Sequence, residues 1–334
     1  MSYHVDVQPS GHVFSATEDQ TILEAALKEG IMLRHSCREG TCGTCKGKVL
    51  SGQVDHADTD LEVLSQAERD EGYALFCRAK TSSDIQVYAP EVSDLKGISI
   101  QKTAARVARL ERVSDDVVIV HLALPPTMPF NYFPGQYAEV ILKDGSRRSY
   151  SMASLPGADS QLEWHIRNTG GVFSAFAYND LKERALLRLE GPFGTFYLRD
   201  TTKPMVFLAS GTGFAPIKGL LTQLAQQQPN NTRPVSLYWG GRKLSDLYMH
   251  EWVKEFAAQH TWLTYIPVLS EVAAVDNWHG ATGYVHHQVL SDFDSLADYE
   301  VYACGNPLMV DSAKEDFIAQ RALDEQNFFA DAFV

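Results

Sequence analysis

The sequence predicts a chain of three domains, α+β and α/β in class: a small α+β domain, an antiparallel β-barrel and a parallel α/β domain. Three observations predict this order. Four cysteines gather in the first 80 residues, short strands and turns fill the middle, and glycine loops follow apolar strands in the last third. A chain of 334 residues is too long for one ordinary domain. We expect the domains at 1–95, 102–200 and 201–334, with 96–101 as a linker.

The first domain is organised around Cys37, Cys42, Cys45 and Cys77. The spacing C-x4-C-x2-C, followed by a long gap to the last cysteine, is what a plant-type [2Fe–2S] cluster requires of its four thiolates. Disulfides suit secreted domains, and the N-terminus predicts no secretory signal. A structural zinc site usually has paired C-x2-C units, and only one is present. We therefore expect these four cysteines to hold the cluster.

Short elements surround these cysteines. We expect strands at 3–8, 13–14, 48–50, 74–77 and 85–87, and helices at 21–29 and 65–71. The fourth ligand, Cys77, is predicted to come from its own strand. Over residues 1–95 this pattern resembles the β-grasp fold of plant-type ferredoxins, and the match includes S-C-R-E-G-T-C-G-T-C and F-C-R.

The middle segment predicts strands at 107–113, 117–124, 138–142 and 162–167, and this spacing favours an antiparallel barrel. In Arg148-x-Tyr150-Ser151, residues two apart point the same way, so Arg148 and Tyr150 face one ligand. The guanidinium suits a pyrophosphate, the ring suits stacking on a flavin, and Ser151 suits a hydrogen bond near the flavin N5. Further on, Gly171, Val172 and Ser174 open a helix whose free N–H groups form an anion site.

The last segment opens with an apolar run at 205–209, followed by Gly211-Thr212-Gly213 and a helix that contains Pro216 near its start. Strand, glycine loop and helix in this order predict a dinucleotide phosphate site. Further strands are expected at 235–239, 264–269 and 301–303, and a helix at 309–321. Gly241 and Arg242 follow the second strand. Ligands of such an open sheet sit at the carboxyl ends of its strands.

The motifs F-x-P-G-Q-Y, R-x-Y-S, G-G-x-x-S and G-P-F-G occur over residues 102–334 in the order found in the ferredoxin–NADP reductase superfamily. This resemblance implies that Cys304 and Gly305, in C-G-x-P, lie beside the nicotinamide ring. It also implies that Asp331 and Phe333 lie by the flavin ring. Ser151, Cys304 and Asp331 are therefore the residues expected to tune or position hydride transfer.

The domain order resembles the single-chain reductase components of bacterial oxygenases, such as benzoate dioxygenase reductase. It is also similar to CDP-6-deoxy-Δ3,4-glucoseen reductase. The resemblance implies electron flow from NADH through FAD and the [2Fe–2S] cluster to a terminal oxygenase component. FAD belongs between them because a flavin holds two, one or no electrons. A deoxysugar dehydratase is the alternative acceptor. A redox-sensing binding protein is a third hypothesis, which the complete flavin and nicotinamide motifs argue against.

The nucleotide is expected to be NADH rather than NADPH. The usual acidic residue for an NAD ribose is missing after the second strand, where Arg242 and Lys243 could meet a 2′-phosphate. Related reductases with similar G-x-R sequences nevertheless favour NADH.

The net charge of −13 argues against nucleic-acid binding, which relies on cationic contacts to phosphate. Residues 1–95 carry 16 acidic and 8 basic side chains, which predicts salt-sensitive coupling to a basic redox partner. No apolar run approaches the roughly 20 residues of a membrane span. We expect a cytoplasmic monomer. The adjacent His286 and His287 are predicted to serve the surface or packing.

Overall fold

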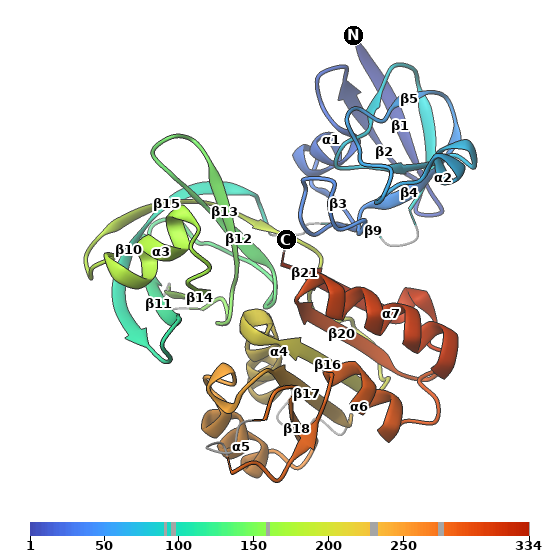
Figure 1. Ribbon diagram of the computed structural model, residues 1–334. Helices are drawn as coiled ribbons and strands as arrows, with labels where there is room; N and C mark the ends of the chain where they lie inside the picture. The colour runs from blue at the N-terminus through green and yellow to red at the C-terminus, as the bar shows by residue number, and fades with distance from the viewer. Residues whose placement is uncertain (90–91, 95–97, 158–160, 228–232, 273–276, 334) are drawn as a thin grey trace. The chain divides into compact units, whose positions relative to one another are not determined.

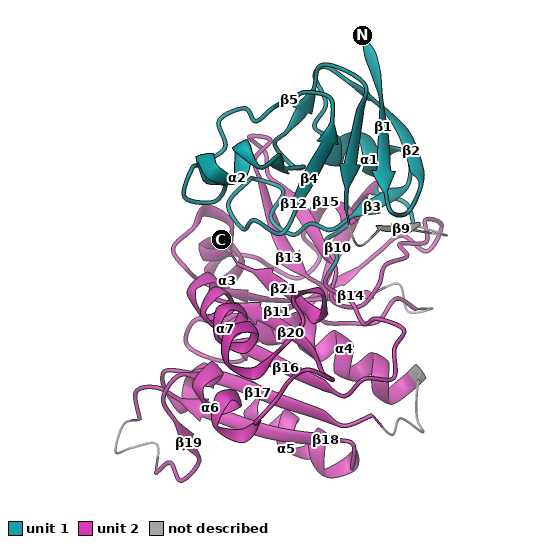
Figure 2. Cartoon of the chain, turned by 90° about the vertical axis from the view of Figure 1, so that its right-hand side faces the viewer, with its two compact units in different colours: residues 1–100, 193–195, 334 teal, residues 101–192, 196–333 magenta. Residues whose placement is uncertain are grey.

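The computed structural model describes residues 1–89, 92–94, 98–157, 161–227, 233–272 and 277–333. They form two compact units (Figure 2): unit 1 contains residues 1–100 and 193–195, and unit 2 contains residues 101–192 and 196–333. No helix in the described part of the chain is both long enough and apolar enough to cross a membrane.

Unit 1 is built on a mixed five-stranded sheet in the order β2-β1-β8-β4-β6. Its strands are β1 (Ser2–Gln8), β2 (His12–Thr17), β8 (Ile85–Tyr88), β4 (Lys46–Ser51) and β6 (Tyr73–Leu75). Val5 and Val7 alternate into the core, as the period of a strand requires. Helix α1 (Ile22–Lys28) begins at Thr21, whose hydroxyl accepts from the Glu24 N–H in a reciprocal capping box. A second capping box, at Ser65, starts α2 (Gln66–Asp70).

The predicted strand over 74–77 is too long. Strand β6 ends at Leu75, and Cys77 lies in the turn that follows. Two small sheets were not predicted: β3 (Ile31–Leu33) with β9 (Val92–Asp94), and β5 (Val54–Asp55) with β7 (Lys80–Thr81). Of the predicted linker 96–101, residues 96 and 97 lie outside the described residues, 98–100 are irregular, and residue 101 already belongs to β10.

The first part of unit 2 is a six-stranded sheet in the order β13-β12-β15-β10-β11-β14. Its strands are β10 (Gln101–Arg112), β11 (Val117–Ala123), β12 (Tyr137–Ile141), β13 (Arg147–Ser151), β14 (Gln161–Arg167) and β15 (Leu186–Phe193). The pairs β10–β11, β10–β15, β11–β14 and β12–β13 are all antiparallel. Buried residues alternate along β10 at Thr103, Ala105 and Val107, so one face lies on the core. Helix α3 (Val172–Asn179) packs against that core through Phe173.

The second part of unit 2 is a parallel sheet in the order β19-β18-β17-β16-β20-β21 (Figure 1). Its strands are β16 (Met205–Ser210), β17 (Val235–Gly241), β18 (Leu263–Leu269), β19 (Ala281–Thr282), β20 (Glu300–Gly305) and β21 (Phe328–Ala332). The first five residues of β16 and all six of β20 are buried, because both faces of the sheet are covered.

Helices cover each face of this sheet. One apolar cluster joins it to α4 (Phe214–Gln227) and α5 (His250–Gln259), and the other joins it to α6 (Val285–Asp292) and α7 (Pro307–Arg321). The described residues of this unit also include three short 3₁₀ turns: η1 (Gly211–Gly213), η2 (Leu244–Asp246) and η4 (Glu325–Asn327). Strands β17, β18 and β19 follow one another on one side of β16, whereas β20 and β21 lie on the other side. The strand order therefore reverses between β16 and β20, which makes this the switch point of the sheet. A doubly wound sheet binds its ligands at such a point.

Candidate functional site

The four predicted cluster ligands lie together in unit 1 as two close pairs, and none forms a disulfide. A hydrogen bond from the Cys42 thiol, outweighing burial, lowers the pKa of Cys37 to about 4. Cys45 and Cys77 share a similar bond, which lowers the pKa of Cys77 and raises that of Cys45. Because each iron of a [2Fe–2S] cluster takes two thiolates beside its two bridging sulfides, two pairs of sulfurs fit that cluster.

The structure explains how Cys77 reaches this site from outside a strand. The first N–H groups of α1, those of Ile22 and Leu23, donate to the carbonyls of Ala79 and Phe76 at 2.9 Å each. The Phe76 N–H donates to the Cys45 carbonyl at 3.1 Å. The unpaired donors of a helix start therefore fix the turn that carries the fourth ligand.

His35 is a residue of unit 1 that the sequence reasoning missed. Its Nδ1 lies 2.8 Å from the Leu33 carbonyl, and its Nε2 accepts the Gly194 N–H at 2.9 Å. Burial lowers the pKa of His35 to about 4, so the ring is neutral and bonds at both nitrogens. Thr195 adds three hydrogen bonds to the His35 backbone, two through its hydroxyl and one through its N–H. The ring and backbone of His35 thus hold Gly194 and Thr195 within unit 1. His35 itself lies two positions before the predicted cluster ligand Cys37.

The three residues predicted to position hydride transfer meet in unit 2. Cys304 on β20 pairs in register with Asp331 on β21, and the Ser151 hydroxyl on β13 donates to Asp331 Oδ2 at 3.2 Å. All three are buried. Burial raises the pKa of the Cys304 thiol well above its usual value, so it stays protonated. The site therefore brings the neutral Cys304 thiol and the Ser151 hydroxyl next to the Asp331 carboxyl group.

The glycine loop lies directly against Cys304. A side chain at Gly213 would collide with the Cys304 carbonyl, and one at Gly305, which has a φ of +131°, would collide with Ser210. The Ser210 hydroxyl in turn accepts the Asn306 N–H at 2.9 Å. Such close backbone contact needs glycine, and it joins the ends of β16 and β20 at the switch point. Thr212 lies inside η1, and Pro216 is the third residue of α4.

The predicted flavin residues lie on β13 and at the start of α3. Tyr150 is half-buried against Trp164 and Phe173, and burial raises its pKa to about 12. Arg148 is exposed, and its Nη1 donates to the Arg147 carbonyl of the same strand at 2.6 Å. The strand thus leaves the Arg148 guanidinium accessible to an anion.

At the helix start, Gly171 occupies the N-cap and offers no side chain to the first-turn N–H groups. Val172 is 73% exposed, so this turn is open to solvent, while the buried Ser174 hydroxyl donates to the Gly171 carbonyl at 3.2 Å. An open helix start of this kind suits phosphate oxygens. Phe333 follows β21, is 38% exposed, and donates its N–H to the Gly305 carbonyl at 2.8 Å.

A buried polar chain, which the sequence did not reveal, joins the barrel to the nucleotide sheet inside unit 2. Lys218 Nζ lies 2.8 Å from Glu163 Oε1, which lies 2.7 Å from His165 Nε2, and His165 Nδ1 lies 2.7 Å from the Tyr248 hydroxyl. Burial acts to raise the pKa of Glu163, but the bond from His165 and the charge of Lys218 outweigh it and lower the pKa to about 2.

This chain fixes the tautomer of His165. Burial lowers the pKa of His165, so its ring is neutral. An ionised carboxylate can only accept, so Nε2 carries the proton and Nδ1 accepts from the Tyr248 hydroxyl. Tyr248 also packs edge-on against Trp239, whose indole N–H donates to the Gly211 carbonyl at 3.1 Å. The barrel is therefore connected to the glycine loop through one aromatic contact with a hydrogen bond at either end.

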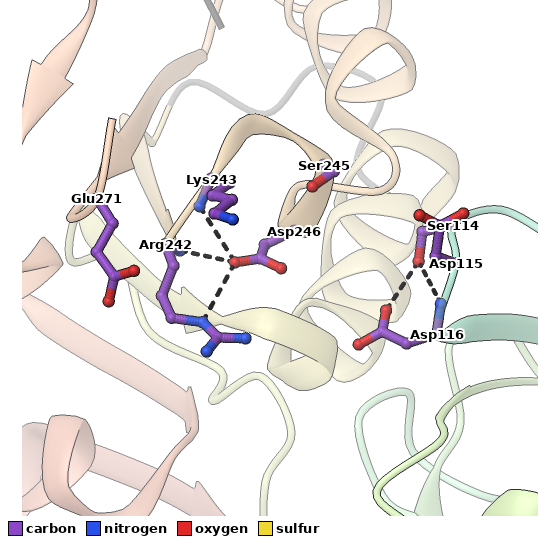
Figure 3. Close-up of a pocket in the computed structure, with 8 residues that line it drawn as sticks. All are labelled: Ser114, Asp115, Asp116, Arg242, Lys243, Ser245, Asp246 and Glu271. Atoms are coloured by element: carbon purple, nitrogen blue, oxygen red, sulfur yellow. Dashed lines mark hydrogen bonds and ion pairs between the residues drawn. The ribbon is translucent and has the colours of Figure 1, made fainter. Parts of the chain in front are cut away.

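A pocket of about 340 Å³ opens beside Arg242, where the β17 strand has ended (Figure 3). Asp246 Oδ2 accepts the backbone N–H groups of Arg242 at 2.8 Å and Lys243 at 3.2 Å, and lies 3.7 Å from Arg242 Nε. Gly241, at the end of β17, accepts the Ser270 N–H. The remaining lining residues are Ser114, Asp115, Asp116, Ser245 and Glu271. Four carboxylates therefore face two cations.

Three family models match the chain. Residues 5–82 match a 2Fe-2S iron-sulfur cluster binding domain, residues 104–197 an oxidoreductase FAD-binding domain, and residues 207–315 an oxidoreductase NAD-binding domain. The CDP-6-deoxy-L-threo-D-glycero-4-hexulose-3-dehydrase reductase of Yersinia pseudotuberculosis is 41% identical, over 100% of this chain and 99% of that protein. The chain belongs to the iron–sulfur flavoprotein reductases. The phenol 2-monooxygenase reductase component DmpP of a Pseudomonas species is 33% identical, over 100% and 95%.

A solved member of this family shares the fold. The crystal structure of the Amycolatopsis cytochrome P450 reductase GcoB matches with a TM-score of 0.81 and 32% identity, over 99% of this chain and 98% of that one. The predicted fold class and reductase chemistry are thus confirmed: a cluster domain, a flavin barrel and a nicotinamide-nucleotide domain in one chain. The hypothesis of a redox-sensing binding protein is set aside, because the flavin and nucleotide domains both match oxidoreductase families.

Proposed function

We propose that this reductase takes hydride from NADH and delivers single electrons through FAD and a [2Fe–2S] cluster to the terminal component of a bacterial oxygenase. FAD, when bound, supplies the conversion of one two-electron donor into two one-electron steps. The observation that carries the proposal is the meeting of Ser151, Cys304 and Asp331 at the switch point of the sheet.

The chain's own residues have distinct roles in this proposal. Arg148 and the open start of α3, at Gly171, Val172 and Ser174, hold the FAD phosphates. Tyr150 and Phe333 flank the flavin ring. The nucleotide phosphates rest on Gly211, Thr212 and Gly213 ahead of Pro216, while Gly241 and Arg242 contact the adenosine end. Cys304 and Gly305 would lie beside the nicotinamide, and Ser151 and Asp331 would supply hydrogen bonding near the flavin ring. Cys37, Cys42, Cys45 and Cys77 ligate the cluster.

NADH is proposed as the donor because of the charge in the pocket beside Arg242. Asp246 already pairs with the Arg242 guanidinium that a 2′-phosphate would need, and Asp115, Asp116 and Glu271 line the same pocket. A phosphate there would meet more negative than positive charge, and so would bind less well than a free ribose hydroxyl.

Anaerobic titration with NADH, followed by absorbance and electron paramagnetic resonance, tests the relay. We expect the flavin band to bleach and a reduced-cluster signal to appear after it, and we expect NADPH to need a much higher concentration. Flavin reduction without the cluster signal would refute the assignment of the four cysteines.

The acceptor is tested separately. An oxygenase component is the first candidate, and a deoxysugar dehydratase is the second, which the 41% identity to a dehydrase reductase favours. NADH-driven reduction of each purified class of acceptor distinguishes them. The excess of acidic residues in 1–95 favours an acceptor with a basic docking face. Turnover with that acceptor should therefore fall as salt rises, and an unchanged rate would contradict this docking mode.

We further propose the domain limits 1–95, 102–200 and 201–334 with a linker at 96–101, a monomeric state and a cytoplasmic location. The free cysteines of the chain suit a reducing compartment. Light scattering of the purified protein tests the monomer, and cell fractionation tests the location.

A further inference from the structure

Three side chains of the kind that bind transition metals converge between α6 and α7, outside both redox sites. They are His286 and His287 near the start of α6 and Asp316 on α7. One ligand atom from each lies within 4.8 Å of the other two. His286 Nε2 and Asp316 Oδ2 are 3.7 Å apart, which is too far for a hydrogen bond and close enough to share an ion.

His286 is the unusual member of this group. Its side chain is buried, with 7% of the residue exposed, and its Nδ1 finds no hydrogen-bond partner among the described residues. Burial, and then the neighbouring His287 ring, lower the pKa of His286, while the charge of Asp316 acts against them. The ring is therefore neutral, which is the form of imidazole that ligates metals. Nε2 is the nitrogen that faces Asp316, so an ion bound there would leave the ring proton on Nδ1.

Neighbouring contacts hold the three ligands in place. Asp316 Oδ1 accepts the Gln320 amide at 2.7 Å, which leaves Oδ2 directed at His286. The Tyr284 ring stacks on His286 at 6.1 Å and meets His287 edge-on at 5.7 Å. Partners that orient a metal's ligands are a regular part of metal sites.

We propose that His286, His287 and Asp316 bind one divalent ion of the zinc class. Two imidazoles and a carboxylate suit Zn²⁺, whereas Mg²⁺ and Ca²⁺ prefer oxygen ligands alone. Ligand atoms around tetrahedral zinc are roughly 3.4 Å apart, so the existing 3.7 Å needs little change. The ligand atoms already lie within 4.8 Å of one another, so small side-chain adjustments bring all three onto one ion. Solvent completes the fourth position, and the ion ties α6 to α7.

The experiment is isothermal titration with ZnCl₂ of the zinc-free holoenzyme, with cluster and flavin bound. We expect one site with a Kd on the order of 10 µM, weaker than a closed four-ligand zinc site. Saturation should raise the thermal midpoint, because the ion binds only the folded chain. Excess Mg²⁺ should leave the titration unchanged.

Two variants decide the assignment. His287→Ala and Asp316→Asn, at accessible positions, should each weaken this site at least tenfold, while His279→Ala, another exposed histidine, should leave it intact. Retention of the site in either variant, or no binding by the wild type below about 100 µM, overturns the proposal. The cluster and flavin spectra must stay constant throughout. The reductase assignment does not depend on either result, because the anaerobic NADH titration tests it without zinc.

Discussion

The acidic residues of the pocket beside Arg242 give a quantitative prediction about nucleotide choice. Asp115 and Glu271 are both exposed lining residues. We expect Asp115→Asn and Glu271→Gln, which keep side-chain shape and remove charge, to improve the use of NADPH while leaving NADH almost unaffected. NADPH differs from NADH by one phosphate on the adenosine ribose, so only its binding should respond to the lost charge.

The magnitude follows from the size of the pocket. A volume of 340 Å³ places wall carboxylates about 7 Å from a phosphate at its centre. At that distance in water, one carboxylate repels a phosphate of nearly two charges by about 1 kcal/mol, or about fivefold in affinity. The double variant should therefore gain about 20-fold in kcat/KM for NADPH at low salt. At 0.15 M salt each carboxylate should contribute only about twofold, because screening acts over about 8 Å.

The assay is the initial rate of ferricyanide reduction with each nucleotide, at about 10 mM and about 150 mM ionic strength. Asp294→Asn, an exposed carboxylate outside the pocket, controls for net charge. Equal changes for NADH and NADPH, or no change for NADPH, would refute the assignment of this pocket to the adenosine end.

Three further predictions concern buried polar contacts. Ser151→Ala should slow flavin reduction by NADH about 10-fold or more, since a hydrogen bond to a charged group is worth about 1.5–3 kcal/mol; stopped-flow absorbance measures this. Tyr248→Phe should destabilise unit 2 by about 1–3 kcal/mol in denaturant unfolding, because it leaves the buried Nδ1 of His165 unsatisfied. The destabilising effect of Glu163→Gln should shrink as the pH falls from 6 to 3. The folded-state pKa of Glu163 is about 2, below the ordinary 4.5, so its contribution exists above pH 4.5 and disappears as the pH approaches 2; thermal midpoints across that range measure it.

Each of these has an outcome that contradicts it. Normal flavin reduction in Ser151→Ala would separate the hydroxyl from the hydride step. Tyr284→Phe, at a ring that is 65% exposed, is the control for Tyr248, and equal stability of the two variants would dismiss the buried bond. A gap between Glu163→Gln and the wild type that stays constant with pH would mean that Glu163 is not ionised in the folded protein.

Local patterns in the sequence were sufficient for the elements with strong periodicity or caps. The capping box at Thr21, the apolar run of β16 and the glycine loop after it all act within a few residues, so their structure could be predicted. The domain order and fold class followed from these motifs. The short pairs β3–β9 and β5–β7 could not be predicted, because two or three residues carry no period.

Contacts between distant segments explain what sequence reasoning missed. Strands β15 and β21 were not predicted, because their partners β10 and β20 lie more than 20 residues away in the sequence. The carboxylates facing Arg242 include Asp115 and Asp116, which come from the barrel rather than from the nucleotide sheet. A search for an acidic residue just after the second strand could not find them. The partners of His165 are likewise visible only in three dimensions.

The pairing of β20 with β21 has a consequence for how this reductase tolerates change. Side chains on a strand alternate, so removing one residue from the connection at 322–327 would slide β21 by one position. Ala332 would then take the place of Asp331 opposite Ser151, and Asp331 would face the apolar cluster that contains Phe328 and Ala330. Length in this connection is therefore constrained by the chemistry of the site as well as by folding. A one-residue deletion there should give a less stable protein that reacts poorly with NADH.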